Sequence, residues 1–139
     1  MGYELKQTDT GGVQFWEDVS GSKAAIVQSL NWAVARGATN TVTVGYLPAN
    51  ARIIGIFVQN AVVSNATSTA TVSVGLSGGS ATFFSAAQDV KSAIGNFSQA
   101  ATANWAVSSS SQTLTCTYTE TGTASTAGTS YVSVNFVQN

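Results

Sequence analysis

The stretch that most constrains the fold runs from residue 41 to residue 79 and contains three strand patterns joined by two turns. Residues 41–47 alternate between apolar and small side chains, with Val42, Val44 and Tyr46 on one side, which is typical of a half-buried strand. Pro48 ends this strand, because proline has no backbone N–H to donate to a ladder. Residues 71–76 alternate in the same way, so the stretch predicts antiparallel β structure.

Residues 52–63, the middle of this stretch, are apolar on both faces of the expected strand. Strict alternation places one set on one face (Ile53, Phe57, Ala61, Val63) and a second set on the other (Ile54, Ile56, Val58, Val62). A strand of this kind lies between a core and a second covering layer or a neighbouring subunit.

Further strands are expected along the rest of the chain. Residues 112–120 place Leu114, Cys116 and Tyr118 on one face against threonines, and residues 130–138 place Val132, Val134 and Phe136 on one face. We also expect a short strand at residues 13–16, another from Phe83–Phe84 to near Asp89, a loop at 91–98 with Ile94 and Phe97 turned inward, and a short element anchored by Trp105 and Val107.

Residues 23–36 carry both helix and strand signals. Ser22 and Gly37 are placed as helix caps around Ile26, Leu30 and Val34, whereas Trp32 shares strand parity with those three residues. Strand is favoured, because everything after Gly37 is strand and turn. The expected fold is therefore all-β: a single-domain antiparallel β-sandwich, jelly-roll-like, with little or no helix, over residues 13–139, preceded by an N-terminal arm at residues 1–12.

Composition excludes several classes of function. Only 8% of the 139 residues are charged and the net charge is −1, which argues against binding to nucleic acid or to an anionic membrane. There is no run of about 18 apolar residues and no apolar segment typical of a secretion signal. The chain has no histidine, so the commonest general base and metal ligand are missing. We expect no enzyme activity, no catalytic residue, no metal and no cofactor.

Cys116 and the three tryptophans need separate interpretation. Cys116 is in phase with Leu114 and Tyr118, which favours a buried, inert thiol over a nucleophile. Trp16, Trp32 and Trp105 could lie in the core, at a subunit interface or against a sugar, and the core is the usual place for a lone tryptophan in a sandwich. Trp16 is the best interface candidate. We expect Tyr3, Leu5, Phe15 and Trp16 to form an arm or edge that packs against a neighbouring protein subunit.

A family resemblance takes the interpretation further. Residues 42–56 (VTVGYLPANARIIGI), the polar turn at 65–69, TVSVG at 71–75, and Asp89-Val90-Lys91 followed by Gly95 resemble a pattern of small virion proteins of tailed phages. These are capsid cement or decoration proteins with a jelly-roll fold, such as the cement protein of Bordetella phage. The resemblance covers roughly residues 41–97. It implies a homodimer or homotrimer on the capsid exterior, assembled in the host cytoplasm, that stabilises the lattice of the major capsid protein.

Two other functions stay open at this point. The chain could be another virion component, such as a head–tail connector or a tail or fibre part, which predicts a ring of fixed order. It could instead be a glycan-binding β-sandwich module, which predicts an exposed tryptophan or tyrosine beside polar groups in a groove.

Overall fold

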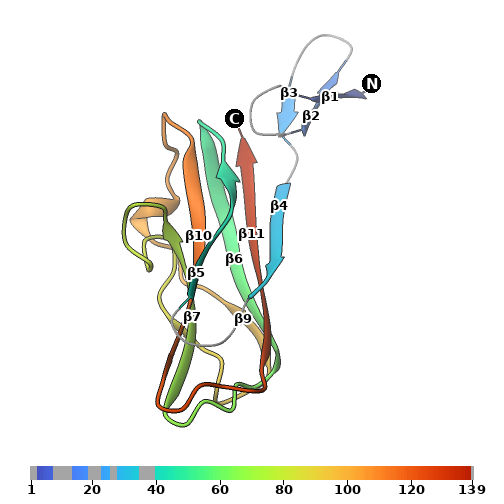
Figure 1. Ribbon diagram of the computed structural model, residues 1–139. Helices are drawn as coiled ribbons and strands as arrows, with labels where there is room; N and C mark the ends of the chain where they lie inside the picture. The colour runs from blue at the N-terminus through green and yellow to red at the C-terminus, as the bar shows by residue number, and fades with distance from the viewer. Residues whose placement is uncertain (1–2, 8–13, 19–22, 26–27, 35–39, 139) are drawn as a thin grey trace.

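The computed structural model describes residues 3–7, 14–18, 23–25, 28–34 and 40–138, and its main body is a sandwich of two antiparallel four-stranded sheets (Figure 1). One sheet has the strand order β5-β10-β7-β8 and the other has the order β4-β11-β6-β9. This architecture confirms the predicted all-β class and antiparallel sandwich, while its jelly-roll character stays a prediction. The strands are β4 (Gln28–Ala33), β5 (Asn40–Leu47), β6 (Ala51–Val62), β7 (Thr69–Leu76), β8 (Gln88–Asp89), β9 (Gly95–Ser98), β10 (Gln112–Thr121) and β11 (Thr129–Gln138).

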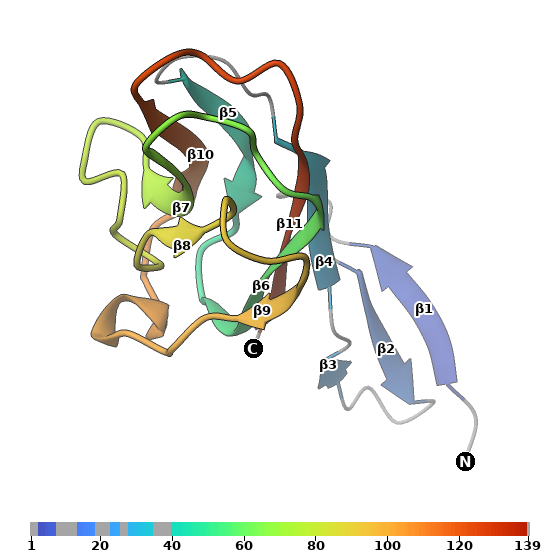
Figure 2. The ribbon, with the colours of Figure 1, turned by 90° about the horizontal axis from the view of Figure 1, so that it is seen from below.

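The chain passes from one sheet to the other at nearly every connection between these strands. Only β7 and β8 follow each other within one sheet. Because the two sheets are built alternately, their inner faces share one core. Its largest fully buried side chains come from β5, β6, β7, β10 and β11, from Phe84 between β7 and β8, and from Val90 after β8. Figure 2 looks along the sandwich and shows the two layers with this interior between them.

The buried faces of β10 and β11, which carry the two longest alternating patterns, were predicted correctly. Leu114, Cys116 and Tyr118 of β10 are buried, and so are Val132, Val134 and Phe136 of β11. Both strands lie in the interior of their sheets, where each one pairs with two neighbours. The patterns could be read directly because each strand presents a single apolar face to the core.

β5 departs from the predicted alternation at a β-bulge. Leu114 of β10 pairs with Gly45, but the next residue, Thr115, pairs with Thr43, so Val44 has no partner of its own. Val42 and Val44 pack against the core as expected, but Tyr46 is 62% exposed and Leu47 is buried. The prediction that Tyr46 shares the core face was wrong, because one extra residue in a strand reverses the faces beyond it.

β6 contains a second bulge, which corrects both predicted faces of residues 52–63. Asn135 of β11 pairs with Gly55 and Phe136 pairs with Ile53, so Ile54 is the extra residue. Ile53 and Ile56 are therefore both buried, although alternation assigned them to opposite faces, while Ile54 is 45% exposed. The outer face of β6 carries Phe57, which is only half-buried, so no covering layer within the described chain lies over this strand.

Three expectations between residues 83 and 107 were wrong. The strand expected from Phe83–Phe84 to near Asp89 is present only at its end, as β8; the two phenylalanines lie in a bend before it, and Phe84 is fully buried. Residues 95–98 form β9 instead of a loop, and Ile94 is 66% exposed, whereas Phe97 is half-buried as expected. A short 3₁₀ helix, η1 (Ala103–Trp105), packs Trp105 against the core, but Val107 is exposed. These residues lack a long periodic pattern, so tertiary contacts decide their conformation.

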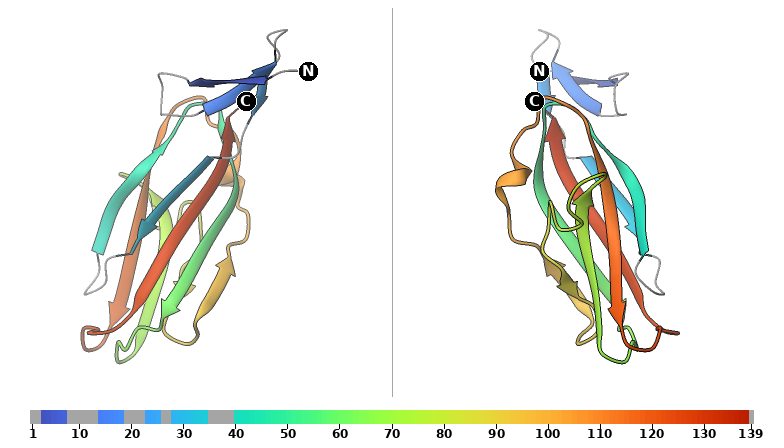
Figure 3. Two further views of the ribbon diagram at one scale, coloured as in Figure 1. Left: turned by 90° about the vertical axis from the view of Figure 1, so that its right-hand side faces the viewer. Right: turned by 60° about the vertical axis from the view of Figure 1, so that its left-hand side comes forward.

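Near the N-terminus, three short strands form a separate antiparallel sheet in the order β1-β2-β3: β1 (Tyr3–Gln7), β2 (Gln14–Asp18) and β3 (Lys23–Ala25). β2 confirms the strand predicted near residues 13–16. β3 and β4 confirm the strand interpretation of residues 23–36 wherever that segment is described. Figure 3 shows this sheet beyond one end of the sandwich, at the end where the C-terminus lies.

Candidate binding surfaces

The reactive groups of the described sandwich have structural roles. Cys116 is buried, as predicted, and burial raises the pKa of its thiol to about 11, against a smaller opposing effect of the Trp32 indole. The thiol is therefore protonated at neutral pH and is a poor nucleophile. Among the described residues, no group of three or more cysteine or carboxylate side chains could hold a metal ion.

The described carboxylates stabilise loops. Asp89 accepts hydrogen bonds from the Ser92 hydroxyl and from the backbone N–H of Lys91, which hold the pKa of its carboxyl below the usual value. Glu120 accepts one from the Tyr118 hydroxyl at 2.7 Å, and that hydroxyl also lies 2.9 Å from the Ser64 hydroxyl. Both carboxylates thus fasten turns at the ends of strands.

The N-terminal residues that the sequence singled out lie on β1 and β2. Leu5 pairs directly with Trp16, and Tyr3 pairs with Asp18. Successive residues of a strand alternate between faces, so the register puts Tyr3, Leu5 and Trp16 on one face of the small sheet and Phe15 on the opposite face. The structure thus brings three of the four predicted interface residues onto one face; their contact with a partner stays a prediction.

The outer face of the sheet β5-β10-β7-β8 carries a row of hydroxyl side chains. Thr117 of β10 lies between Thr41 of β5 and Ser73 of β7, and the Thr41 and Thr117 hydroxyls are 2.9 Å apart. The Thr69 and Thr121 hydroxyls are 2.6 Å apart farther along the same sheet. The hydroxyls of these two pairs satisfy each other, and the face also has a smaller hollow of about 250 Å³ beside Thr41 and Thr117.

The outer face of the sheet β4-β11-β6-β9 is different, because it holds a groove of about 630 Å³. The left view of Figure 3 shows this sheet with β4, β11, β6 and β9 side by side. The ladder arranges the outward residues of the groove in two rows across the strands. One row is Ala33, Tyr131, Gln59 and Asn96, and the other contains Asn31, Ser133 and Phe57. We call these seven residues the outer groove.

Aromatic surface and unused amide groups meet in the outer groove. Tyr131 is 43% exposed, and the Phe57 ring lies against Gly55, where an added Cβ would be 2.8 Å from Cε2 of that ring. The absence of a side chain at Gly55 therefore leaves room for the Phe57 ring. Within the described chain, the side chains of Asn31, Gln59, Asn96 and Tyr131 form no hydrogen bond.

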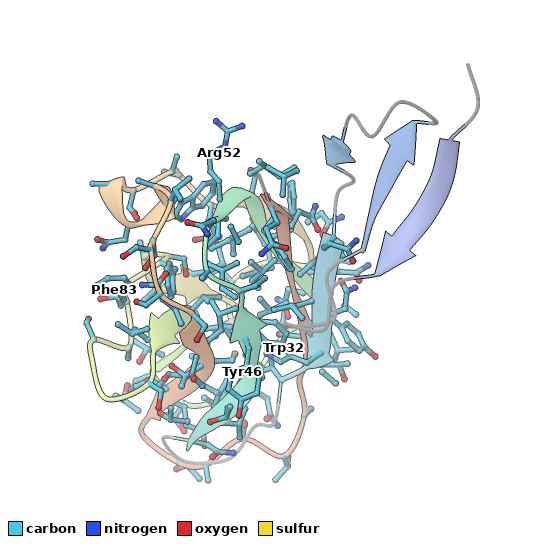
Figure 4. All side chains as sticks on the ribbon, turned by 90° about the horizontal axis from the view of Figure 1, so that it is seen from above. Trp32, Tyr46, Arg52 and Phe83 are labelled. Atoms are coloured by element: carbon cyan, nitrogen blue, oxygen red, sulfur yellow. The ribbon has the colours of Figure 1, made fainter. Side chains whose placement is uncertain are left out.

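Two of the three tryptophans lie against the core, which is the place the sequence analysis gave as usual for a tryptophan in a sandwich. Trp32 and Trp105 are partly buried and pack against the core, and the indole N–H of Trp105 donates to the Phe84 carbonyl at 2.7 Å. Figure 4 shows Trp32 between β4 and β5, and Arg52 extending away from the sandwich. Trp16 lies on β2, for which only the backbone register is described.

Sequence reasoning missed the outer groove. The alternation that puts Val132 and Val134 on the core face of the last strand implies that Tyr131 and Ser133 lie on its outward face. The available signal was an outward aromatic residue on a strand whose other outward side chains are small or polar. Asn31, Phe57, Gln59 and Asn96 could not be added without the strand order, since they come from three other strands. No helix in the described part of the chain is long and apolar enough to cross a membrane.

Comparison with known proteins gives likeness in structure only. No family model matches the sequence, and no curated protein matches it. A chain of the cyanophage Pam1 capsid asymmetric unit is similar, with a TM-score of 0.63 and 22% identity over 83% of this chain and 85% of that chain. A chain from the capsid of Ralstonia phage GP4 has a TM-score of 0.61 and 16% identity over 98% of this chain and 91% of that chain.

A third similar chain comes from the acidic stable capsid structure of Helicobacter pylori bacteriophage KHP30, with a TM-score of 0.57 and 14% identity over 81% of this chain and 93% of that chain. In each case the match covers most of both chains, so it involves the whole sandwich and not a single hairpin. The protein therefore shares its fold with chains found in the capsids of three phages.

Proposed function

We propose that this protein is a structural component of a tailed-phage virion, and specifically a cement or decoration protein on the capsid exterior that binds and stabilises the lattice of the major capsid protein. The observation that carries the proposal is the whole-chain likeness to chains in three phage capsid structures. The sequence resemblance to phage cement proteins, among them that of Bordetella phage, supports the same role.

The surface chemistry of the sandwich fits such a role. Its described charged residues are few (Arg52, Asp89, Lys91 and Glu120), and two of them, Asp89 and Glu120, fasten turns. Large faces without charge have a small desolvation cost when they pack against another protein. A protein that binds the assembled lattice better than it binds free capsid subunits stabilises the shell by mass action.

The N-terminal region is the proposed contact with the capsid or with a neighbouring copy. Tyr3, Leu5 and Trp16 share one face of a small sheet that lies beyond the end of the sandwich (Figure 1). Strands of three to five residues bury little apolar surface by themselves, so a covering partner would stabilise this sheet. Packing this face against a neighbour would supply that cover.

The test is cosedimentation of the purified protein with capsids that lack it. We expect saturable binding at a fixed ratio to the major capsid protein and a higher capsid melting temperature. Deletion of residues 1–12 should weaken binding at least tenfold while circular dichroism still shows a folded sandwich. Tyr46→Ala, which changes an exposed aromatic residue on β5, is the matched control and should bind normally.

Two results would contradict the proposal. Unchanged binding after deletion of residues 1–12 would remove the arm from the contact. A failure of the full chain to bind capsids, together with a closed ring of fixed order by light scattering, would instead support a head–tail connector or a tail part.

A further inference from the structure

The outer groove has the chemistry of a ligand site, and this distinguishes it from the other outer face of the sandwich. On the outer face of the sheet β5-β10-β7-β8, two pairs of hydroxyls are bonded to each other, Thr41 with Thr117 and Thr69 with Thr121. In the groove, Asn31, Gln59, Asn96 and Tyr131 keep their donors and acceptors unused within the described chain. Several other amide side chains of the sandwich do form hydrogen bonds: Asn60, Asn65, Gln88, Gln99, Asn104 and Gln138.

We propose that the outer groove binds a neutral saccharide. Its volume of about 630 Å³ is in the range of small-molecule sites. No charged residue lines it, which disfavours phosphate, sulfate or carboxylate groups as the recognised feature. A neutral sugar presents C–H groups on the face of its ring and hydroxyls around its edge, so it needs aromatic surface and amide groups side by side.

The ladder register provides this arrangement. Tyr131 lies between Ala33 and Gln59 in one row, and Ser133 lies between Asn31 and Phe57 in the next. Neighbouring strands are about 4.8 Å apart, so the aromatic ring of Tyr131 has an amide group one strand away. At its β4 end this row finishes with the small side chain of Ala33.

The position of the groove also argues against a peptide as the ligand. An added peptide strand is recognised through the backbone groups of a sheet edge. Tyr131, Ser133, Phe57 and Gln59 belong to β11 and β6, the two inner strands of this sheet, whose backbone groups are already paired on both sides. Recognition here depends on side chains, and the side chains present suit a sugar.

The test begins with an array of neutral hexose and N-acetylhexosamine oligosaccharides, followed by titration of the best oligosaccharide monitored by NMR. We expect saturable binding of the full chain. Tyr131→Ala and Gln59→Ala should each weaken it at least tenfold, and Tyr131→Phe, which keeps the ring, should weaken it less than Tyr131→Ala. Tyr46→Ala is the control for loss of an exposed aromatic residue outside the groove and should bind sugar normally.

The possible results separate this site from the proposed capsid role. Loss of sugar binding with normal capsid cosedimentation in Tyr131→Ala would establish the groove as an independent saccharide site. No saturable binding on the array, or equal binding by Tyr131→Ala and the unmodified chain, would overturn the inference. Loss of capsid binding in Tyr131→Ala without any sugar binding would show that the groove is a protein contact. A cell-surface polysaccharide that contains the bound oligosaccharide, and that itself binds the protein, would be the source of the ligand.

Discussion

Asn60 shows how a single polar residue can join three parts of the sandwich. It is 1% exposed, and its amide nitrogen donates to the carbonyls of Val90 at 3.0 Å and Ala93 at 2.6 Å. Its amide oxygen accepts from the Ser130 hydroxyl at 3.0 Å. β6, the segment between β8 and β9, and β11 are therefore connected through one side chain.

We expect Asn60→Ala to lower the free energy of unfolding by about 2–4 kcal/mol, because it leaves several buried polar groups without a partner. Urea denaturation measures this change. Asn31→Ala, which truncates an exposed amide on β4, is the matched control and should change the unfolding free energy by less than about 0.5 kcal/mol. Equal effects of the two substitutions would contradict the role assigned to Asn60.

At the scale of secondary-structure elements, the end of β7 depends on a glycine that approaches the following turn. A Cβ built at Gly75 would lie 2.5 Å from the Ser80 carbonyl oxygen and 2.6 Å from the Ala81 Cα. Both neighbours are backbone atoms of the turn that leaves β7, and the Ser80 carbonyl also accepts from the Leu76 N–H at 3.2 Å. The turn cannot move away without losing that hydrogen bond.

Gly75→Ala should therefore destabilise the protein by about 1–3 kcal/mol, as expected for overpacking against atoms that cannot rotate away. Thermal unfolding followed by circular dichroism is a suitable measurement. Gly79→Ala in the same turn is the control, because its added Cβ would meet Leu76 side-chain atoms at 3.4 Å, which is ordinary contact. A melting temperature for Gly75→Ala equal to that of Gly79→Ala would show that the turn has room to adjust.

Over the whole molecule, the ladders divide the described strands into the sandwich and the N-terminal sheet. β1, β2 and β3 pair only with one another among the described strands, and β2 pairs with no strand of either sandwich sheet. The boundary between the arm and the sandwich near residues 12–13 stays a prediction. Because the N-terminal sheet shares no ladder with the sandwich among the described strands, truncation of the N-terminal residues tests whether the sandwich folds without that sheet.

We expect removal of residues 1–25 to shift the melting temperature of the sandwich by less than about 3 °C, because the described core comes from residues 30–136. Differential scanning calorimetry gives the shift, and the NMR spectrum of the truncated chain should keep the resonances of β10 and β11. A loss of cooperative melting would mean that the N-terminal sheet contributes to the core.

The all-β class, the antiparallel sandwich, and the buried faces of β10 and β11 could be predicted from the sequence. Each depends on local alternation, which one strand carries in its own residues. The buried position of Cys116 followed from the same periodicity. The exclusion of histidine-based chemistry likewise needs only composition.

The places where the alternation breaks, and the outward residues that lie together, depend instead on tertiary contacts. The bulges at Val44 and Ile54 arise from pairing with β10 and β11, so they expose Tyr46 and bury both Ile53 and Ile56 against the predicted pattern. The outer groove combines residues from four strands that are distant in sequence. Its composition depends on strand order and register, and these are set by packing between sheets instead of by any local sequence pattern.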